Sequence, residues 1–128
     1  MNLLFVSLLL ISKPDGSTLP HFCSPTNADF VEYRYKNNTP VCKRNVNISM
    51  RLKVYADYNV TSDEHKNYTI DHLVPLFLGG SNDRQNLWPQ HKSIRTSRLE
   101  GTLFREVREG KTHPSNAINT VLKVKFGK

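Results

Sequence analysis

The sequence predicts a mixed α+β fold, in which a short β-hairpin is followed by a helix and flanked by other helices. Tyr68–Leu73 has the composition of a short strand that Pro75 ends or bends. Asn86–Trp88 reads as a second short strand, closed by Pro89. From His91 to Arg108 the apolar residues recur at helical spacing. Strand, strand and helix therefore follow one another within one stretch of chain.

Three segments place apolar residues three or four positions apart, which is the spacing of one helix face. They are Val46–Tyr58, His91–Arg108 and a last helix that Ser115 caps. Gly110 ends the middle helix. The inward-facing residues expected of the three helices are Met50, Val54 and Tyr58; Leu99, Leu103 and Val107; and Ile118, Val121 and Leu122.

The length and charge of the chain limit what it can be. Its 128 residues suit one domain, expected over 21–128, and a hydrophobic fraction of 38% is typical of an ordered globular protein. The net charge of +7 favours a polyanionic partner, with nucleic acid first and an anionic membrane surface second.

The N-terminal residues Leu3–Ile11 form an almost unbroken apolar run. The run is too short for a membrane span, which needs roughly 20 apolar residues, and has the length found in a secretory signal peptide. Residues 1–20 are therefore expected to be a leader and spacer, and a buried strand or helix is the alternative. This predicts a secreted or periplasmic protein without stable membrane association, with the cytoplasm as the other possibility.

Cys23 and Cys42 are the two cysteines, and they form no Cys-x-x-Cys pair. In an exported protein we expect one disulfide between them, which contributes about 3 kcal/mol by constraining the unfolded chain. In a cytosolic protein they would be two reduced, buried thiols.

Chemistry is concentrated in one ordered motif: Asp71-His72, Pro75, Gly79-Gly80 and Asn86. A histidine can act as a general base near neutral pH, and an aspartate can hold a hard divalent cation. Neighbouring residues on a regular strand point to opposite faces, so a kink at Pro75 or a bulge is needed to bring both side chains to one site.

This motif resembles the ββα-metal core of the HNH endonucleases, whose pattern is Asp-His, a proline three residues on, a Gly-Gly turn and Asn-Leu. The chain also resembles a group of small exported HNH proteins, because Cys23, Tyr33-Arg34-Tyr35 and Cys42-Lys-Arg-Asn-Val46 precede the motif. The resemblance covers roughly 22–108.

The resemblance implies an endonuclease that hydrolyses DNA phosphodiester bonds with a divalent metal ion. His72 matches the general base that activates water, Asp71 matches a metal ligand, and Asn86 matches the residue that fixes the loop and so orients the base. Mg²⁺ is the favoured ion, with Mn²⁺, Ni²⁺ or Zn²⁺ as alternatives.

The third metal ligand departs from the family pattern. The family places a His or Asn about nine residues after its middle Asn, where this sequence has Arg95. His91, slightly early, and Glu100, somewhat late, are the available donors. Glu100 is favoured by its inward direction on the helix, since an inward carboxylate needs a partner, and His91 by its residue type.

Arg95, Arg98 and Arg105 fall on one face of the predicted helix. They lie just after the motif, where a phosphate backbone would pass, so we expect them to contact nucleic acid. The alternative is an ordinary solvated helix face.

Two other functions fit the same residues. One is a nucleic-acid-binding module with a degenerate, inactive HNH site, which the missing third ligand favours. The other is a secreted nuclease toxin that requires a neutralising partner protein in the producing cell.

Overall fold

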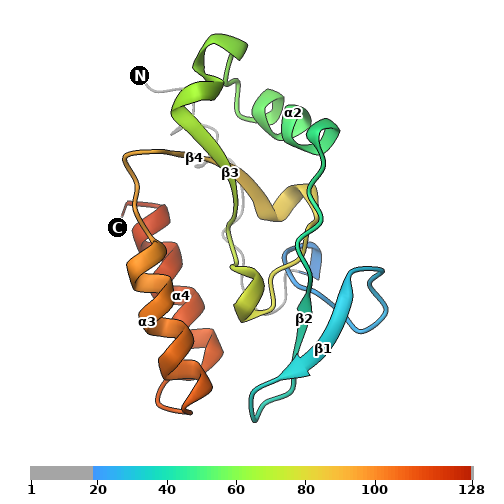
Figure 1. Ribbon diagram of the computed structural model, residues 1–128, viewed down its shortest axis with the longest axis vertical. Helices are drawn as coiled ribbons and strands as arrows, with labels where there is room; N and C mark the ends of the chain where they lie inside the picture. The colour runs from blue at the N-terminus through green and yellow to red at the C-terminus, as the bar shows by residue number, and fades with distance from the viewer. Residues whose placement is uncertain (1–18, 128) are drawn as a thin grey trace.

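The computed structural model describes residues 19–127 and has the mixed α+β architecture that the sequence predicts (Figure 1). The predicted leader falls almost entirely outside the described residues, and the apolar run Leu3–Ile11 lies wholly outside them. The strands and helices in chain order are β1 (Phe30–Arg34), β2 (Thr39–Cys42), α2 (Ile48–Asp57), β3 (Tyr68–His72), β4 (Leu87–His91), α3 (Ser97–Arg108) and α4 (Pro114–Lys125).

The strands form two separate antiparallel hairpins, β1–β2 and β3–β4. In the second hairpin Asp71 lies opposite Trp88 and His72 lies opposite Leu87. The prediction that Pro89 closes the second strand is wrong, because Pro89 lies inside β4 and β4 continues to His91. A proline is tolerated there because, within residues 19–127, this sheet consists of β3 and β4 alone, so one edge of β4 has no neighbouring strand that needs an N–H donor.

Asn86 fixes the loop between β3 and β4. Its side chain is fully buried; Oδ1 accepts a hydrogen bond from the Val74 N–H at 2.9 Å. Its Nδ2 donates to the carbonyl oxygens of Val74 and Ser81, at 3.1 and 2.8 Å. Gly80 makes this close approach possible, since a Cβ there would lie 1.8 Å from the Val74 carbonyl oxygen. The loop is thus held by side-chain and backbone contacts at both ends.

The helices occur where the apolar spacing predicts them, but two of the starts differ. α3 begins at Ser97 and not near His91, because β4 and a short connection occupy 91–96. α4 begins at Pro114, and its cap is His113 and not Ser115, since His113 Nδ1 accepts the Ser115 N–H at 3.1 Å. Gly110 follows α3 in the left-handed conformation (φ 77°), as a helix-ending glycine should.

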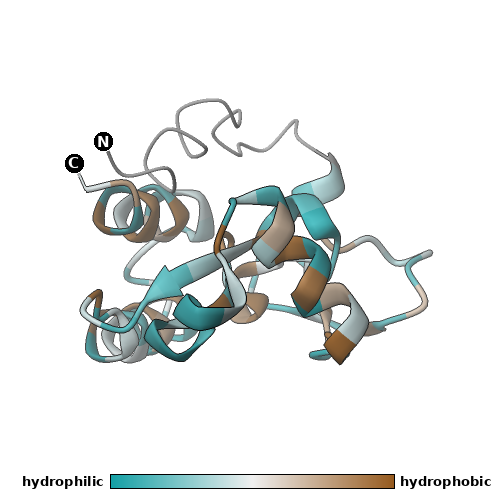
Figure 2. Ribbon diagram, turned by 90° about the horizontal axis from the view of Figure 1, so that it is seen from above, coloured by the Kyte–Doolittle hydropathy of each residue, from teal (hydrophilic) through white to brown (hydrophobic). Residues whose placement is uncertain are grey.

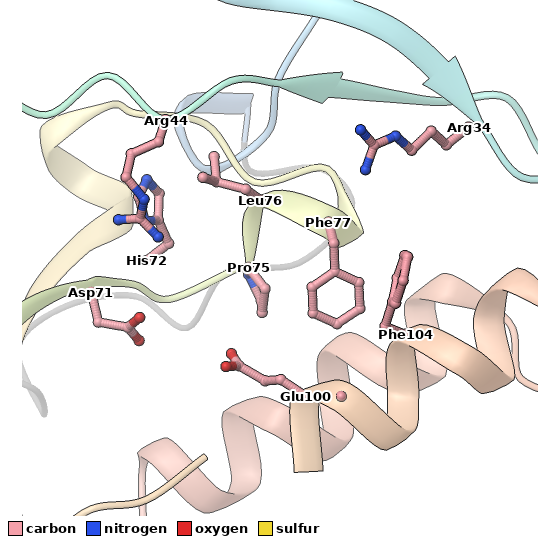
Figure 3. Close-up of a pocket in the computed structure, with 10 residues that line it drawn as sticks. Arg34, Arg44, Asp71, His72, Pro75, Leu76, Phe77, Glu100 and Phe104 are labelled. Atoms are coloured by element: carbon pink, nitrogen blue, oxygen red, sulfur yellow. The ribbon is translucent and has the colours of Figure 1, made fainter. Parts of the chain in front are cut away.

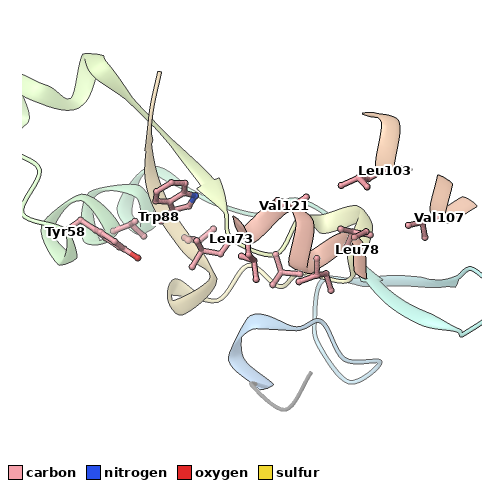
Figure 4. Packing of buried hydrophobic residues seen from close by; sticks show 13 residues of the cluster. Tyr58, Leu73, Leu78, Trp88, Leu103, Val107 and Val121 are labelled. Atoms are coloured by element: carbon pink, nitrogen blue, oxygen red, sulfur yellow. The ribbon is translucent and has the colours of Figure 1, made fainter. Parts of the chain in front are cut away.

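The helices and the β3–β4 hairpin enclose a single cluster of buried side chains (Figure 4). Around each helix, hydrophobic and hydrophilic residues alternate (Figure 2), which is the pattern of helices that bury one face. Trp88 is fully buried and packs in this core. Among residues 19–127 no helix is long and apolar enough to cross a membrane.

Cys23 and Cys42 form the predicted disulfide. Cys42 is the last residue of β2, and the Cys23 N–H donates to the Gly79 carbonyl oxygen at 2.8 Å. The disulfide therefore connects the β1–β2 hairpin to the loop that follows β3. This connection brings the chain after Cys42 close to the motif residues.

Candidate functional site

A pocket of about 430 Å³ lies between the end of β3, the N-terminal half of α3 and the β1–β2 hairpin (Figure 3). It brings together three of the predicted site residues, Asp71, His72 and Glu100. Two arginines and two phenylalanines also line it: Arg34, Arg44, Phe77 and Phe104. Residues from distant parts of the sequence thus meet around the motif.

His72 is the last residue of β3 and is buried, with 2% of its surface exposed. Its Nε2 lies 3.0 Å from Asn82 Oδ1. The amide orientation of Asn82 is fixed, because its Nδ2 donates to Asp29 Oδ2 at 2.9 Å and to the Lys43 carbonyl oxygen at 2.8 Å. Asn82 therefore offers an acceptor to His72, so that Nε2 carries the proton and Nδ1 keeps its lone pair.

The electrostatics of His72 favour the neutral imidazole. Burial is the main cause that lowers its pKa, and the positive charges of Arg44 and Lys125 act in the same direction. The hydrogen bond with Asn82 and the negative charge of Asp71 oppose this lowering. Nδ1 is buried and has no protein hydrogen-bond partner among residues 19–127. It is a free acceptor near neutral pH.

Asp71 and Glu100 approach each other from β3 and α3 (Figure 3). Between them lies the ammonium group of Lys125, a fully buried side chain from the last turn of α4. Its Nζ is 2.8 Å from Asp71 Oδ2 and 3.6 Å from Glu100 Oε1, and it donates to the carbonyl oxygens of His72 and Leu73. Lys125 is thus the partner that the inward-facing Glu100 requires.

Burial raises the pKa of Glu100, and the negative charge of Asp71 raises it further, while the positive charge of Lys125 lowers it. Thr96 lies at the start of α3, and its hydroxyl donates to Glu100 Oε2 at 3.4 Å. Asp71 Oδ2 also accepts from the Trp88 indole N–H at 3.3 Å. The two carboxylates are consequently held in place by Lys125, Thr96 and Trp88.

The structure does not bring His91 to this pocket. β4 runs away from His72, so that His91 lies opposite Tyr68 at the far end of the hairpin. The His91 and Tyr68 rings pack edge to face with centroids 5.1 Å apart, and His91 Nδ1 is 2.8 Å from the Ser93 hydroxyl. Of the two donors that the sequence leaves open, Glu100 is the one beside Asp71.

The arginines of the pocket are not those expected from the helix pattern. Arg34 and Arg44 line it, whereas Arg95, Arg98 and Arg105 are exposed and do not. On α3 the pocket residues are Glu100, Gly101 and Phe104. The helical positions of Arg98 and Arg105 lie about a quarter turn or more from that face.

Sequence reasoning missed Asn82, Lys125, and the arginines at 34 and 44. Lys125 had a visible signal, because it continues the inward stripe of α4 at one further helical step after Ile118, Val121 and Leu122. Arg34 and Arg44 lie within the two segments that carry the resemblance ahead of the motif. Asn82 had none beyond its place in the turn-rich loop.

Comparison with known proteins returned no match for this chain among family models, curated proteins or solved structures.

Proposed function

We propose that this protein is an endonuclease of the HNH type, which uses a divalent cation to hydrolyse nucleic-acid phosphodiester bonds. The observation that carries the proposal is the placement of His72. Asn82 holds the ring so that Nδ1 remains an acceptor, and the same pocket contains two carboxylates and two arginines. A base, a cation site and phosphate-binding groups are the parts that this hydrolysis needs.

In this proposal each residue has one task. His72 Nδ1 takes a proton from water as the water oxygen attacks phosphorus, and the Asn82 carbonyl group stabilises the imidazolium that forms through Nε2. Arg34 and Arg44 bind the phosphate oxygens, a role for which the planar guanidinium is well suited. The bond from phosphorus to the leaving oxygen then breaks, the leaving oxygen takes a proton from a water molecule, and His72 returns its proton to the solvent.

Asp71 and Glu100 supply the oxygen donors that a hard cation prefers. The Lys125 ammonium already lies between the two carboxylates, so a cation would bind them from the pocket that both of them line. Among residues 19–127 no three His, Cys, Asp or Glu side chains gather into a group that could bind a metal. Mg²⁺ is usually held by one or two carboxylates together with waters and substrate phosphates, so two carboxylates suffice. The cation would act as a Lewis acid that stabilises the charge developing on the phosphate.

Plasmid cleavage tests the proposal. Purified protein is incubated with supercoiled plasmid, and separately with single-stranded DNA, in Mg²⁺, Mn²⁺, Ni²⁺ or Zn²⁺, with and without chelator. We expect nicking in at least one metal, and a rate about 100-fold or more lower for His72→Ala. His65→Ala, which removes a partly exposed imidazole that lines neither this pocket nor its neighbours, is the matched control. Absence of wild-type cleavage in every metal would exclude an enzyme of this type, and equal cleavage by His72→Ala would exclude the mechanism.

A nucleic-acid-binding module without catalysis is the second candidate, because two carboxylates are a small ligand set and both of them already pair with Lys125. It predicts salt-sensitive binding without cleavage. Calorimetry separates the two, since tight Mg²⁺ or Mn²⁺ binding that Asp71→Ala abolishes contradicts the inactive module.

The disulfide supports an exported protein, because disulfides persist mainly in oxidising compartments. We therefore propose that residues 1–20 direct export. Fusing them to a reporter enzyme that is active only after export tests this, and a reporter that stays inactive contradicts it.

A further inference from the structure

The pocket has two chemically different ends (Figure 3). His72, Asp71 and Glu100 form one end, which holds both acidic side chains of the lining. At the other end lie Phe77, from the 3₁₀ turn after β3, and Phe104, from α3. Their rings meet edge to face with centroids 5.7 Å apart, and both are partly exposed. The proposed hydrolysis gives these rings no task.

Cations surround the aromatic end. Arg34 lies on the β1 side of this end. It forms an exposed ion pair with Glu32 at 2.8 Å, and exposed ion pairs contribute little to stability. On the α3 side, the guanidinium of Arg108 lies 5.1 Å from the centre of the Phe104 ring. Aromatic rings flanked by arginines combine a surface for stacking with a surface for phosphate.

The cationic surface continues beyond the aromatic end. Arg108 also lines a second pocket of about 220 Å³, between the β1–β2 turn and the start of α4. Lys36 and His113 are further members of its lining, which contains no acidic side chain. The β1–β2 hairpin and α3 thus form two walls along which a phosphate backbone can follow positive charge away from His72.

We propose that the Phe77–Phe104 end binds an unpaired base next to the phosphate being cleaved, so that the preferred substrate is a single strand of DNA or RNA. In a duplex the faces of the bases are covered by their neighbours, and a recessed phenyl ring can reach one only when the base is unstacked. Every base has such a face, so no strong sequence preference is expected. This inference rests on the proposed function, which supplies the position of the phosphate.

Binding to the full-length His72→Ala protein, which is not expected to cleave, tests the inference by fluorescence anisotropy at one fixed salt concentration. The probes are a labelled single strand of roughly 12 nucleotides, within the usual range of single-strand sites, as DNA and as RNA, and the duplex of the same DNA. We expect at least one single strand to bind about tenfold more tightly than the duplex. The two single-strand arms show whether DNA, RNA or both are accepted.

Substitution at Phe104 shows whether the pocket causes that preference. Phe104→Leu should weaken single-strand binding about tenfold, the size expected for one lost stacked base, and should leave duplex binding within twofold. Phe104→Tyr should retain the tight binding of the single strand. Tyr68→Leu, at a ring of similar burial that lines neither pocket, is the matched control. Thermal unfolding verifies that each variant folds. If Phe104→Leu does not fold, Phe104→Tyr still allows the single-strand and duplex affinities to be compared.

Duplex binding as tight as single-strand binding overturns the inference, as does a single-strand preference that Phe104→Leu leaves intact. Wild-type plasmid cleavage separates this result from the parent proposal. Cleavage of duplex plasmid without a single-strand preference leaves the nuclease standing, and a Phe104-dependent preference without cleavage in any metal overturns only the nuclease.

Discussion

The ammonium nitrogen of Lys125 lies 2.8 Å from Asp71 Oδ2 and is completely buried. Its second carboxylate, Glu100, is 3.6 Å away, and the His72 and Leu73 carbonyl oxygens complete its surroundings. A buried cation with these acceptors holds the end of β3 against both α3 and α4. The geometry of the site therefore depends on a residue near the C-terminus of the chain.

We predict that Lys125→Met lowers the free energy of unfolding by about 3–5 kcal/mol, because it leaves two carboxylates partly buried without their counter-ion. Urea unfolding measures the change. Lys123→Met, on the exposed side of the same helix, should stay within about 0.5 kcal/mol of wild type. Adding Glu100→Gln to Lys125→Met should restore part of the loss. A loss below about 1 kcal/mol for Lys125→Met would show that the ammonium group does not hold the site together.

The hydrogen bond between Asn82 and His72 leads to a second prediction, on catalysis. Asn82→Ala removes the acceptor that fixes the His72 tautomer, so we expect cleavage to slow about 10- to 100-fold, as for other residues that orient a catalytic ligand. Nitrogen NMR of metal-free protein should show the His72 proton shared between Nδ1 and Nε2, in place of the single Nε2-protonated form. The NMR signal distinguishes this positioning role from simple loss of stability.

Asn45→Ala is the control for that prediction. It removes only an exposed 2.9 Å bond to Asp29 Oδ1, while the Asn45 backbone N–H still reaches Asn82. Activity near the wild-type level is expected. If Asn45→Ala and Asn82→Ala lose activity equally, the effect belongs to the whole loop and not to the His72 tautomer.

Tyr58 gives a prediction on pH. Its hydroxyl is buried without a protein hydrogen-bond partner in the described part of the chain, and burial, with the negative charge of Asp57, raises its pKa well above the ordinary 10.0. The folded state then keeps a proton that the unfolded state loses, so stability must fall as pH rises above about 10. Tyr58→Phe should remove this contribution to the loss of stability at alkaline pH. Near neutral pH it should raise the free energy of unfolding by about 1 kcal/mol, because the substitution removes a buried hydroxyl that has no partner.

Urea unfolding at about pH 7, 9 and 11 measures both effects. Tyr33→Phe, at a ring that is 53% exposed, should leave the pH dependence as in wild type. An alkaline fall of unchanged size in Tyr58→Phe contradicts the assignment.

Local patterns in the sequence were sufficient to predict the β3–β4 hairpin and its loop. Gly80 and Asn86 lie in the same loop, and the Asn86 side chain bonds to Val74 and Ser81 within it. The predicted start of α3, near His91, was wrong for a local reason as well. A proline ends most strands, but Pro89 is acceptable on the free edge of β4, so the strand continues to His91. Short-range chemistry thus accounts for both the success and the error.

The rest of the site could not be predicted because its parts are far apart in the sequence. The contact of Lys125 with the His72 carbonyl spans 53 residues, and that of Asn82 with Lys43 spans 39. Arg34 and Arg44 precede Asp71 by 37 and 27 residues, and the disulfide and hairpin contacts bring them to it. The helix pattern instead predicted that Arg98 and Arg105, which are closer to the motif in sequence, contact the phosphates.

The two sets of arginines give a final prediction, on affinity. Arg34→Ala/Arg44→Ala and Arg98→Ala/Arg105→Ala each remove two positive charges from a net +7, so they change the overall attraction for nucleic acid equally. Only the first pair lines the pocket. We expect it to weaken binding of a labelled single strand about tenfold more than the second pair. Because each lost phosphate contact lowers the salt dependence of single-strand binding by about 0.7 in the log–log slope, the first variant should also show a slope smaller by roughly 1.4. Titrations in the His72→Ala background at several salt concentrations measure both quantities. Equal losses in the two variants would mean that the positive charge of this protein is only a general attraction, and a larger loss at Arg98 and Arg105 would move the phosphate path to the outer face of α3.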